Sequence, residues 1–359
     1  MSAGSTLLNV AGRLTTPLLP DDYLGYLNPL WSRREPRARV QAVIPETADS
    51  ATLWLRPGPG WPAHTPGQYV RMGVDIDGVR HWRTYSLTSV PGRRDGRIAI
   101  CVKATPDGFV SRHLVRDTVP GTIVRLAPPT GEYVLPRPLP ARLTFVTAGS
   151  GVTPVMGMLR ALEQGGALPE IDHVHLAPRH EDVIFGAELR GLAERHAGRY
   201  RLHEHHDDRD GLFSVADLDV RVPGAAAVPT WACGPAPLLD ALAEHFAAAG
   251  APELLTVERF RPVLPAAGAA GEGGTVTFTR SNVTADADGA TPLLVAGEEA
   301  GALLPSGCRM GICRSCVGRL TSGNVRDLRT GDLIAADPTE PDLIQTCVSA
   351  AAGPVEIDL

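Results

Sequence analysis

The chain has 359 residues, a hydrophobic content of 43%, a charged content of 21% and a formal net charge of −6. This length exceeds one ordinary hydrophobic core and indicates two or three domains of roughly 100 to 150 residues each. The composition excludes a disordered protein, and no stretch reaches the roughly 18 apolar residues that a membrane-spanning helix needs.

The first twenty residues, MSAGSTLLNVAGRLTTPLLP, carry no basic segment ahead of an apolar core and are not typical of a secretion signal. We therefore expect a cytoplasmic protein. Disulfides are rare in that reducing compartment, so the six cysteines favour metal or redox chemistry. From Glu272 to the end, twelve acidic residues face six arginines. This acidic end either steers toward a basic partner or is an ordinary solvated surface.

Residues 38–137 are expected to form the first domain, after an N-terminal extension over residues 1–37. Short runs of alternating polarity, bounded by glycine and proline, are typical of strands in a closed antiparallel β-barrel. These runs are residues 51–57, 68–74, 83–90, 97–103 and 122–128.

One of these runs contains RTYS, Arg83 to Ser86. A flavin needs a cation for its phosphates, an aromatic side chain against its ring and a small hydroxyl near its reactive nitrogen. RTYS supplies them in that order and resembles the flavin fingerprint of the ferredoxin-NADP reductase family. The resemblance implies cofactor contacts at Arg83, Thr84, Tyr85 and Ser86. The alternative is a solvent-facing pair of strand residues.

Downstream, VKATPDGFVSRHL resembles the second flavin segment of the same family. There, a glycine-containing turn leads into a helix whose N-terminal N–H groups bind pyrophosphate. Gly108, Val110 and Ser111 are the candidate residues, although Ser111 is also a candidate for a plain helix N-cap. The implied flavin is FAD, with FMN as the alternative.

Residues 138–262 alternate between buried strand-like runs and helical stretches, which predicts a doubly wound parallel α/β domain. The strand-like runs are residues 142–148, 172–177, 200–205 and 230–234, and the helical stretches include 155–164 and 236–249.

TAGSGVTPVMGML follows the first of these strands and departs from the G-x-G-x-x-G fingerprint. It resembles the nicotinamide-nucleotide loop of the reductase family. Gly149 and Gly151 would lie in the turn, and Thr153 would lie beside the nicotinamide. A tight turn that binds no ligand is the alternative.

CGP, Cys233 to Pro235, closes the fourth strand at the carboxyl edge, where open α/β sheets bind ligands. In the resembled family this cysteine faces the nicotinamide carbon that gives up hydride, and Gly234 belongs to the same motif. The candidate catalytic residues are therefore Ser86, Thr153 and Cys233.

LAPRHEDVIFGAELR follows the second strand, where the adenine ribose would lie. Arg179 or Arg190 is a candidate to bind a 2′-phosphate, which favours NADPH over NADH. An ordinary surface arginine is the alternative. HEHHDD, residues 203–208, contains metal-ligand residue types, but alternating polar residues that run out of a strand are typical of a solvated loop.

The stretch RPVLPAAGAAGEGG cannot build a core and suits a flexible tether. We expect a linker over residues 263–273 and a third domain over 274–359. In the third domain, Cys308, Cys313, Cys316 and Cys347 have the spacing C-x4-C-x2-C with a distant fourth cysteine, which is typical of plant-type 2Fe-2S proteins. Zinc sites usually bring two close ligand pairs, so zinc and structural thiols are the weaker interpretations.

Two arginines within this motif, Arg309 and Arg314, are candidates to offset the cluster's negative charge, or are plain surface arginines. Cys101 lies outside the motif and is expected to be a small core residue.

Residues 292–320 resemble the plant-type ferredoxin module, whose fold is a β-grasp. Nearly the whole chain resembles a ferredoxin-NADP reductase superfamily flavoprotein fused to a C-terminal plant-type ferredoxin. This resemblance implies an NAD(P)H-dependent oxidoreductase. It would pass electrons from NADPH or NADH through FAD and a 2Fe-2S cluster, one at a time, to an external oxygenase.

The N-terminal extension resembles that of actinobacterial electron-transfer reductases that serve acyl desaturases, so a desaturase is the first expectation for the acceptor. A Rieske oxygenase or cytochrome P450 is the alternative. The extension either forms an amphipathic helix with peripheral membrane contact or packs on the barrel.

Two other functions are alternatives to electron transfer to a protein partner. One is a reductase acting on a small molecule or dioxygen, which the complete cysteine set disfavours. The other is a redox-sensing regulator. Lys103 is the only lysine and the one basic stretch, Arg33 to Arg39, is short, so no nucleic-acid partner is expected.

Overall fold

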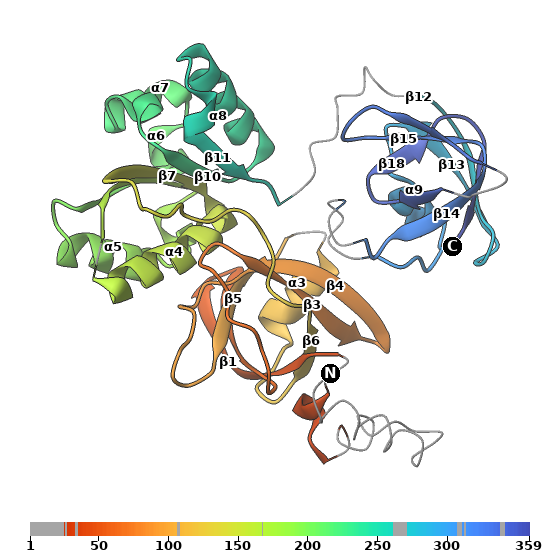
Figure 1. Cartoon of the computed structure of the whole chain (residues 1–359), viewed down its shortest axis with the longest axis horizontal. Coiled ribbons are helices and arrows are strands. Elements are labelled where there is room, and N and C mark those ends of the chain that lie inside the picture. Colours follow the sequence, from red (N-terminus) through yellow and green to blue (C-terminus); the bar gives the residue numbers. More distant parts are fainter. Residues whose placement is uncertain are drawn as a thin grey trace. The chain divides into compact units, whose positions relative to one another are not determined.

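The computed structural model describes residues 25, 27–32, 35–105, 108–166, 168–260, 271–306, 311, 314–337 and 342–359. Cys308, Cys313 and Arg309, most of the predicted linker and the first 24 residues of the extension lie outside this set. The chain forms two compact units, one built almost wholly from residues before Arg259 and one from Arg259 to Leu359 (Figure 1).

The first unit begins with a six-stranded antiparallel sheet in the order β4-β3-β6-β1-β2-β5. An antiparallel bridge between Leu87 and Ile100 joins the end of β4 to β5, so the sheet closes on itself. This confirms the predicted antiparallel barrel. Its elements are β1 (Arg37–Thr47), β2 (Ser50–Pro57), β3 (Tyr69–Ile76), β4 (Val79–Ser86), β5 (Ile98–Lys103), β6 (Ile123–Leu126) and the helix α3 (Phe109–Arg116).

Local sequence explains the barrel's turns and interior. Asp77 and Gly78, both at positive φ, form the two-residue turn between β3 and β4, as Asp-Gly commonly does in hairpins. The interior is filled by aliphatic side chains that alternate with polar ones, among them Val40, Leu53 and Met72, each 0% exposed. Cys101 is also buried, as expected of a core residue.

The last part of the extension packs on this barrel. Its short 3-10 helix η1 (Pro29–Trp31) begins at Asn28, whose side chain accepts a hydrogen bond from the Leu30 N–H at 3.0 Å. Gly58 has no room for a side chain, because a Cβ atom there would overlap the Leu30 carbonyl. The described end of the extension therefore contacts the start of the barrel.

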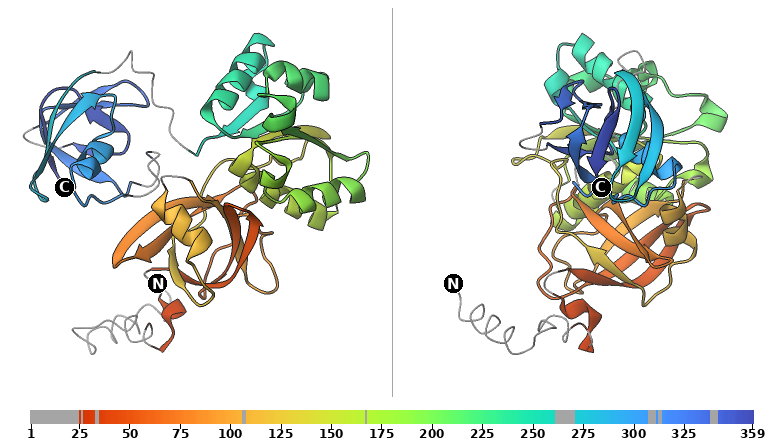
Figure 2. Two further views of the ribbon diagram at one scale, coloured as in Figure 1. Left: turned by 180° about the vertical axis from the view of Figure 1, so that it is seen from behind. Right: turned by 90° about the vertical axis from the view of Figure 1, so that its right-hand side faces the viewer.

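The same unit continues with a five-stranded parallel sheet in the order β11-β10-β7-β8-β9, which confirms the predicted doubly wound domain. Figures 1 and 2 show helices on both faces of this sheet. The strands are β7 (Arg142–Ala148), β8 (Glu170–Ala177), β9 (Tyr200–His206), β10 (Thr230–Cys233) and β11 (Leu255–Glu258). The helices are η2 (Gly149–Gly151), α4 (Val152–Gly165), η3 (His180–Asp182), α5 (Gly186–Arg195), α6 (Asp207–Asp210), α7 (Val215–Arg221), η4 (Ala225–Ala227), α8 (Ala236–Ala248) and η5 (Pro252–Leu254).

The two faces of this sheet carry separate hydrophobic cores. One core packs α4 and α5 against residues such as Phe145 and Tyr200, and the other packs α7 and α8 against residues such as Val146. Strand order reverses between β7 and β10, and such a switch point is where open α/β sheets bind ligands at the carboxyl ends of their strands.

The barrel and the α/β sheet share a packed boundary inside this unit. Helix α4 contributes Gly157, at which an added Cβ atom would lie 2.5 Å from the Leu87 carbonyl oxygen of the barrel. Arg160 on the same helix donates to the Thr88 carbonyl at 2.8 Å. Trp231 of β10 donates through its indole N–H to the Val134 carbonyl at 3.2 Å. These contacts hold the end of β4 and the segment that leaves the barrel against the α/β sheet.

The second unit is a mixed sheet in the order β13-β12-β19-β14-β17, in which β12 and β19 are parallel and the other pairs are antiparallel. Leu293 and Leu294 of α9 join the sheet residues Val276 and Phe278 in one core. This arrangement confirms the β-grasp. Its elements are β12 (Gly271–Phe278), β13 (Val283–Gly289), α9 (Leu293–Glu299), β14 (Val317–Ser322), β17 (Leu343–Gln345) and β19 (Val355–Asp358), with β15 (Asn324–Asp327), β16 (Leu333–Ala335) and β18 (Ser349–Ala351) in a small side sheet.

Across the described ranges, the helices are all too short or too polar to cross a bilayer.

Candidate functional site

The predicted flavin residues lie at the end of β4. Ser86 is buried at 4% exposure, and Tyr85 packs against the barrel core. Arg83 donates to the Trp82 carbonyl at 2.8 Å. The Thr84 hydroxyl is buried with no hydrogen-bond partner among the described residues. A buried polar group without a partner lowers stability by about 1–3 kcal/mol. A hydrogen bond from a polar ligand such as a flavin would remove this cost, so the Thr84 hydroxyl fits a flavin-binding strand.

The second flavin segment begins at Gly108, the N-cap residue of α3, which makes no side-chain cap hydrogen bond. The Ser111 hydroxyl donates to the Gly108 carbonyl at 2.9 Å and accepts from the Thr105 N–H at 3.2 Å. The alternative interpretation of Ser111 as the N-cap is therefore wrong, because the N-cap residue is Gly108, three residues earlier. Val110 is buried in the first turn of α3 and anchors the start of this helix, an element whose N-terminal N–H groups can bind an anion.

The predicted nicotinamide loop forms η2 and the first turn of α4. Gly149 has φ +52°, in the left-handed region that favours glycine. Gly151 lies so close to β10 that a Cβ atom on it would overlap the Cys233 carbonyl. Thr153 is 3% exposed, and its hydroxyl donates to the Ser150 carbonyl at 2.9 Å. Both glycines are thus required by backbone geometry at the end of β7.

Helix α4 brings the three candidate catalytic residues to one region. Thr153 lies in its first turn, which follows the contact between Gly151 and Cys233. One turn later, Gly157 contacts the carbonyl of Leu87, the residue after Ser86. The ends of β4, β7 and β10 therefore converge around the start of α4. A bound cofactor and a nicotinamide would meet there.

Cys233 is fully buried at the end of β10, and its thiol is uncharged. Burial, followed by the nearby Glu258 carboxyl, raises the pKa of the Cys233 thiol well above its usual value, so the thiol stays protonated. Tyr133 is buried, and its hydroxyl has no partner within the described structure. Gly234 contacts Ala148, and Pro235 begins α8.

Glu258 belongs to this region but was missed by the sequence motifs. It ends β11 and pairs in register with Cys233 of β10. Its Oε2 atom is buried without a hydrogen-bond partner among the described atoms, and burial raises the pKa of its carboxyl to about 8. The available signal was the run LLTVE before the tether, which is a further strand that reaches the same carboxyl edge.

The candidate nucleotide arginines differ in their surroundings. The Arg179 side chain is 64% exposed, and its Nη1 lies 4.0 Å from a Glu181 carboxylate oxygen. Arg190 instead places Nη2 2.9 Å from the Glu204 Oε1. Arg179, directly before η3, is therefore the arginine that can turn toward a ligand at this edge.

The segment HEHHDD is not a solvated loop, so that interpretation was wrong. Its first four residues belong to β9, and His205 and His206 are 2% and 3% exposed. Helix α6, which follows directly, holds Asp210, whose carboxylate accepts from the His206 N–H at 3.1 Å. The strand continues further than its polarity indicated because its neighbours cover it.

Two of the four predicted cluster ligands lie in the described part of the second unit. Cys316 and Cys347 are 1% and 4% exposed. Thr346 donates to the Cys316 carbonyl through its N–H at 3.1 Å and through its hydroxyl at 2.9 Å. This tie brings together two sulfur donors that are far apart in sequence. A buried pair of thiols at such a junction fits the iron–sulfur ligand set.

Arg329 is a second residue that the sequence did not reveal. Its Nη1 donates to the Gly311 carbonyl at 3.2 Å, and its Nη2 lies 2.6 Å from an Asp327 carboxylate oxygen. The hydrogen bond that Arg329 donates to the Asp327 carboxylate raises the pKa of the guanidinium, and Cys347 and Cys316 add to the shift. Arg329 therefore interacts electrostatically with both cysteines, whereas Arg314, one of the predicted arginines, is exposed.

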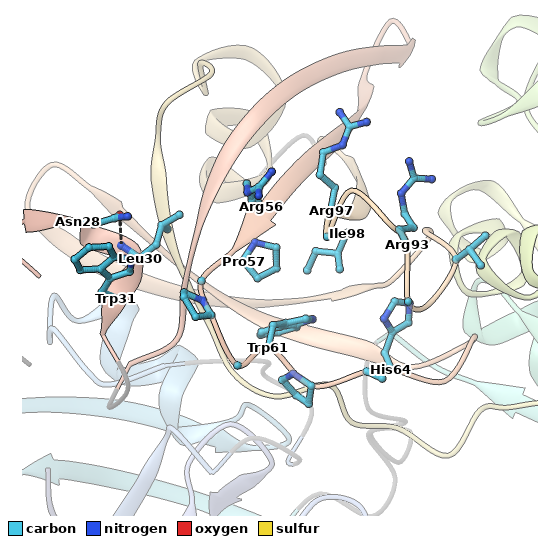
Figure 3. Close-up of a pocket in the computed structure, with 18 residues that line it drawn as sticks. Asn28, Leu30, Trp31, Arg56, Pro57, Trp61, His64, Arg93, Arg97 and Ile98 are labelled. Carbon is cyan, nitrogen blue, oxygen red and sulfur yellow. Dashed lines mark hydrogen bonds between the residues drawn. The ribbon is translucent and has the colours of Figure 1, made fainter. Parts of the chain in front are cut away.

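A cavity of about 550 Å³ lies on the barrel, away from these motifs. Figure 3 shows Trp61 and His64 across the cavity from Arg56, Arg93 and Arg97. None of the predicted flavin or nucleotide residues lines it. Arg93 and Arg97 both form ion pairs with Asp95. Two of the three arginines that line the cavity are therefore already paired.

Comparisons with known proteins agree with this geometry. Residues 63–134 match an oxidoreductase FAD-binding domain, and residues 276–352 match a 2Fe-2S iron-sulfur cluster binding domain. An NADPH oxidoreductase of Mycobacterium tuberculosis is 49% identical over 98% of this chain and 92% of its own length. A stachydrine N-demethylase reductase subunit of Rhizobium meliloti is 27% identical over 88% of this chain and 94% of its own.

Among solved structures, phthalate dioxygenase reductase has the same fold. It superimposes with a TM-score of 0.60 at 24% identity, over 90% of this chain and 97% of its own. The chain therefore belongs to the ferredoxin-NADP reductase superfamily flavoproteins that are fused to a C-terminal plant-type 2Fe-2S ferredoxin, and it is an NAD(P)H-dependent oxidoreductase that transfers electrons through FAD and a 2Fe-2S cluster.

Proposed function

We propose that this reductase takes electrons from NADPH and delivers them singly to an acyl desaturase. The choice of NADPH is supported by exposed Arg179 at the carboxyl end of β8 and by the name of the relative that is 49% identical. The choice of a desaturase is supported by the N-terminal extension, which resembles that of reductases serving such enzymes. The alignment with that relative takes in 98% of this chain.

The packing of α4 is the observation that carries the proposal. Gly151 contacts Cys233 just before the helix starts, and Gly157, in the second turn of the helix, contacts Leu87. A nicotinamide held by the loop Gly149–Gly151 would therefore lie close to a flavin held by β4. Holding two reactants in fixed geometry supplies a large part of catalysis in such a step.

When bound, FAD accepts hydride as an electron pair and releases electrons one at a time, and the 2Fe-2S cluster carries single electrons. Arg83 and the N–H groups of Val110 and Ser111 would hold the flavin phosphates, and Gly108, whose N–H donates to the Thr105 carbonyl, would shape the turn before them. Thr84, Tyr85 and Ser86 would line the ring. Cys308, Cys313, Cys316 and Cys347 would hold the iron.

The protein's own contribution near the nicotinamide is position and charge. Thr153, Cys233, Gly234 and Pro235 would shape that end of the site. Cys233 and Glu258 both remain protonated at neutral pH, because burial raises the pKa of each group. A protonated Glu258 Oε2 offers a hydrogen-bond donor there without adding charge. The protonated Cys233 and Glu258 side chains thus place no negative charge beside the nicotinamide, from which the hydride leaves.

The relay is tested by anaerobic absorbance titration of the holoprotein with NADPH and then with NADH. Flavin and iron–sulfur bands are both expected to bleach, at lower concentration with NADPH. Bleaching of the flavin band alone would contradict the relay.

The nucleotide preference is tested with Arg179→Gln. We expect KM for NADPH to rise about tenfold with kcat nearly unchanged, because the guanidinium pairs with phosphate in substrate binding. KM for NADH should not change. Arg195→Gln, at an exposed position on α5, is the matched control. Equal effects of Arg179→Gln on both nucleotides would remove Arg179 from the 2′-phosphate site.

The acceptor is tested by reconstitution with an acyl desaturase in membranes and, in parallel, with a Rieske oxygenase and a cytochrome P450. Coupled product formation with the desaturase alone supports the proposal. The second candidate, an oxygenase reductase, is favoured by relatives named as reductase components of oxygenases, such as that of 3-ketosteroid-9-alpha-monooxygenase. Turnover with an oxygenase but not with the desaturase would establish it.

A further inference from the structure

Three side chains with metal-binding groups meet at the carboxyl ends of β8 and β9, away from the flavin, nicotinamide and cluster residues and next to the candidate nucleotide arginines Arg179 and Arg190. His180 comes from η3, and Glu204 and His206 come from β9. Their ligand atoms all lie within 4.8 Å of one another. Glu204 and His206 are two residues apart on a strand, so both side chains point to the same face.

The geometry within this trio is close to that of a metal site. The Glu204 Oε2 atom lies 3.9 Å from the His206 Nε2 and 3.9 Å from the His180 Nδ1. Two ligands bound at about 2.0–2.1 Å in tetrahedral coordination are about 3.4 Å apart. Each contact therefore needs to shorten by only about 0.5 Å.

The orphaned state of His206 indicates that a ligand is missing. His206 is 3% exposed, and its Nε2 is buried without a hydrogen-bond partner among the described residues. This is the same atom that faces Glu204. The Glu204 Oε1 is also buried with no partner by hydrogen-bond geometry, although the Arg190 guanidinium lies near it. Such groups are usually satisfied in native proteins, and a bound cation would satisfy both.

A buried polar chain stands behind the trio. His175 lies beside Glu204 in the β8–β9 register, and its Nδ1 is 2.7 Å from the Thr147 hydroxyl. Thr147 also bonds the His173 Nε2 at 2.8 Å, and the His173 Nδ1 bonds the Tyr200 hydroxyl at 2.7 Å. These contacts fix the ring of His175 and leave its buried Nε2 unpartnered within the described structure. A second orphaned imidazole therefore adjoins the site.

A guanidinium now occupies the cation position. Arg190 places Nη2 3.1 Å from the His180 Nδ1 and 2.9 Å from the Glu204 Oε1. It neutralises Glu204 but leaves the His206 Nε2 unsatisfied. A metal ion would bind all three ligands, so it would replace Arg190 at this position.

We propose that His180, Glu204 and His206 form a site for one divalent transition-metal ion, with zinc the best-suited ion. Two imidazoles and a carboxylate suit zinc and its first-row neighbours, whereas calcium and magnesium prefer oxygen ligands alone. Three protein ligands leave one coordination position open to water or another ligand. The site is independent of the cluster cysteines and of the acceptor's identity.

Zinc binding is tested on the holoprotein with flavin and iron content verified, by equilibrium dialysis followed by elemental analysis. We expect one zinc ion per chain in addition to the iron. X-ray absorption at the zinc edge should show nitrogen and oxygen neighbours at about 2.0–2.1 Å. Absence of bound zinc, or a sulfur shell at about 2.3 Å, would overturn the proposal.

Two variants separate a metal site from a merely structural cluster. His180→Ala changes an exposed turn residue, so the fold should persist, and zinc affinity should fall at least about tenfold. Arg190→Gln removes the competing guanidinium, and zinc affinity should rise about tenfold. His203→Gln is the matched control, because His203 lies on the same strand but pairs with Asp172 instead. Unchanged affinity in His180→Ala, or no gain in Arg190→Gln, contradicts the assignment.

Discussion

Gly151 and Cys233 are in backbone contact, so close that a Cβ atom on Gly151 would overlap the Cys233 carbonyl. Cys233 ends β10, whereas Gly151 ends η2, the turn that follows the neighbouring strand β7, and helix α4 starts directly after Gly151. The contact therefore sets how near the nicotinamide loop comes to the strand that carries Cys233. Backbone approach of this kind is available only to glycine.

Gly151→Ala should slow hydride transfer from NADPH by on the order of a hundredfold, because the added methyl group displaces the loop by about 1 Å. Stopped-flow bleaching of the flavin band measures this rate. Gly165→Ala is the matched control, since Gly165 lies on the same helix with open space around it. Similar rates in the two variants would show that the Gly151 contact does not position the nucleotide.

Glu258→Gln should change how stability depends on pH. The carboxyl pKa is about 8 in the folded chain, above the value of about 4.3 expected in the unfolded chain. The folded state thus binds the proton more tightly, and stability falls as pH rises between these values, by at most about 1.4 kcal/mol per unit. The variant should lose this dependence.

The midpoint of heat-induced flavin release, measured at pH 6 and pH 8, reports the Glu258 effect. The wild type should lose more thermal stability than the variant across this interval. Glu253→Gln, at an exposed position in η5, should behave as the wild type does. Parallel pH profiles for Glu258→Gln and the wild type would mean that Glu258 is ionised at neutral pH.

Arg329→Gln should lower the reduction potential of the cluster. Reduction adds a negative charge, and the guanidinium near Cys316 and Cys347 stabilises that charge. Its loss should shift the potential downward by on the order of tens of millivolts. Spectroelectrochemical titration gives the value, and Arg319→Gln on β14 is the control. An unchanged or higher potential in Arg329→Gln would exclude this electrostatic role.

Cys347→Ser should abolish the cluster while leaving the flavin bound, because Cys347 is buried in the second unit and is one of the four proposed cluster ligands. Iron and acid-labile sulfide should fall close to zero, and NADPH should still bleach the flavin. Cys101→Ala, at a buried position on β5 that packs in the core beside α4, should retain both cofactors. Full iron content in Cys347→Ser would require a different fourth ligand.

The sequence by itself determined the three folds, their order and most of the motif positions. Short alternating runs and the Asp77–Gly78 turn predict barrel strands because side chains alternate across a strand and that turn needs positive φ. The cysteine spacing predicted the cluster because the number of residues between the ligands is characteristic of the cluster type. Local patterns of this kind do not require knowledge of distant neighbours.

Tertiary structure alone decided which residues surround those motifs. Glu258 lies beside Cys233 because β11 pairs with β10. The fold of the second unit places Arg329 where it interacts electrostatically with Cys316 and Cys347. His206 is buried at the edge of the α/β sheet, although its segment is polar enough to suggest a loop. Burial and electrostatic environment depend on groups that are remote in sequence, so local patterns place Glu258 and His206 on the chain but do not reveal the surroundings of these three residues.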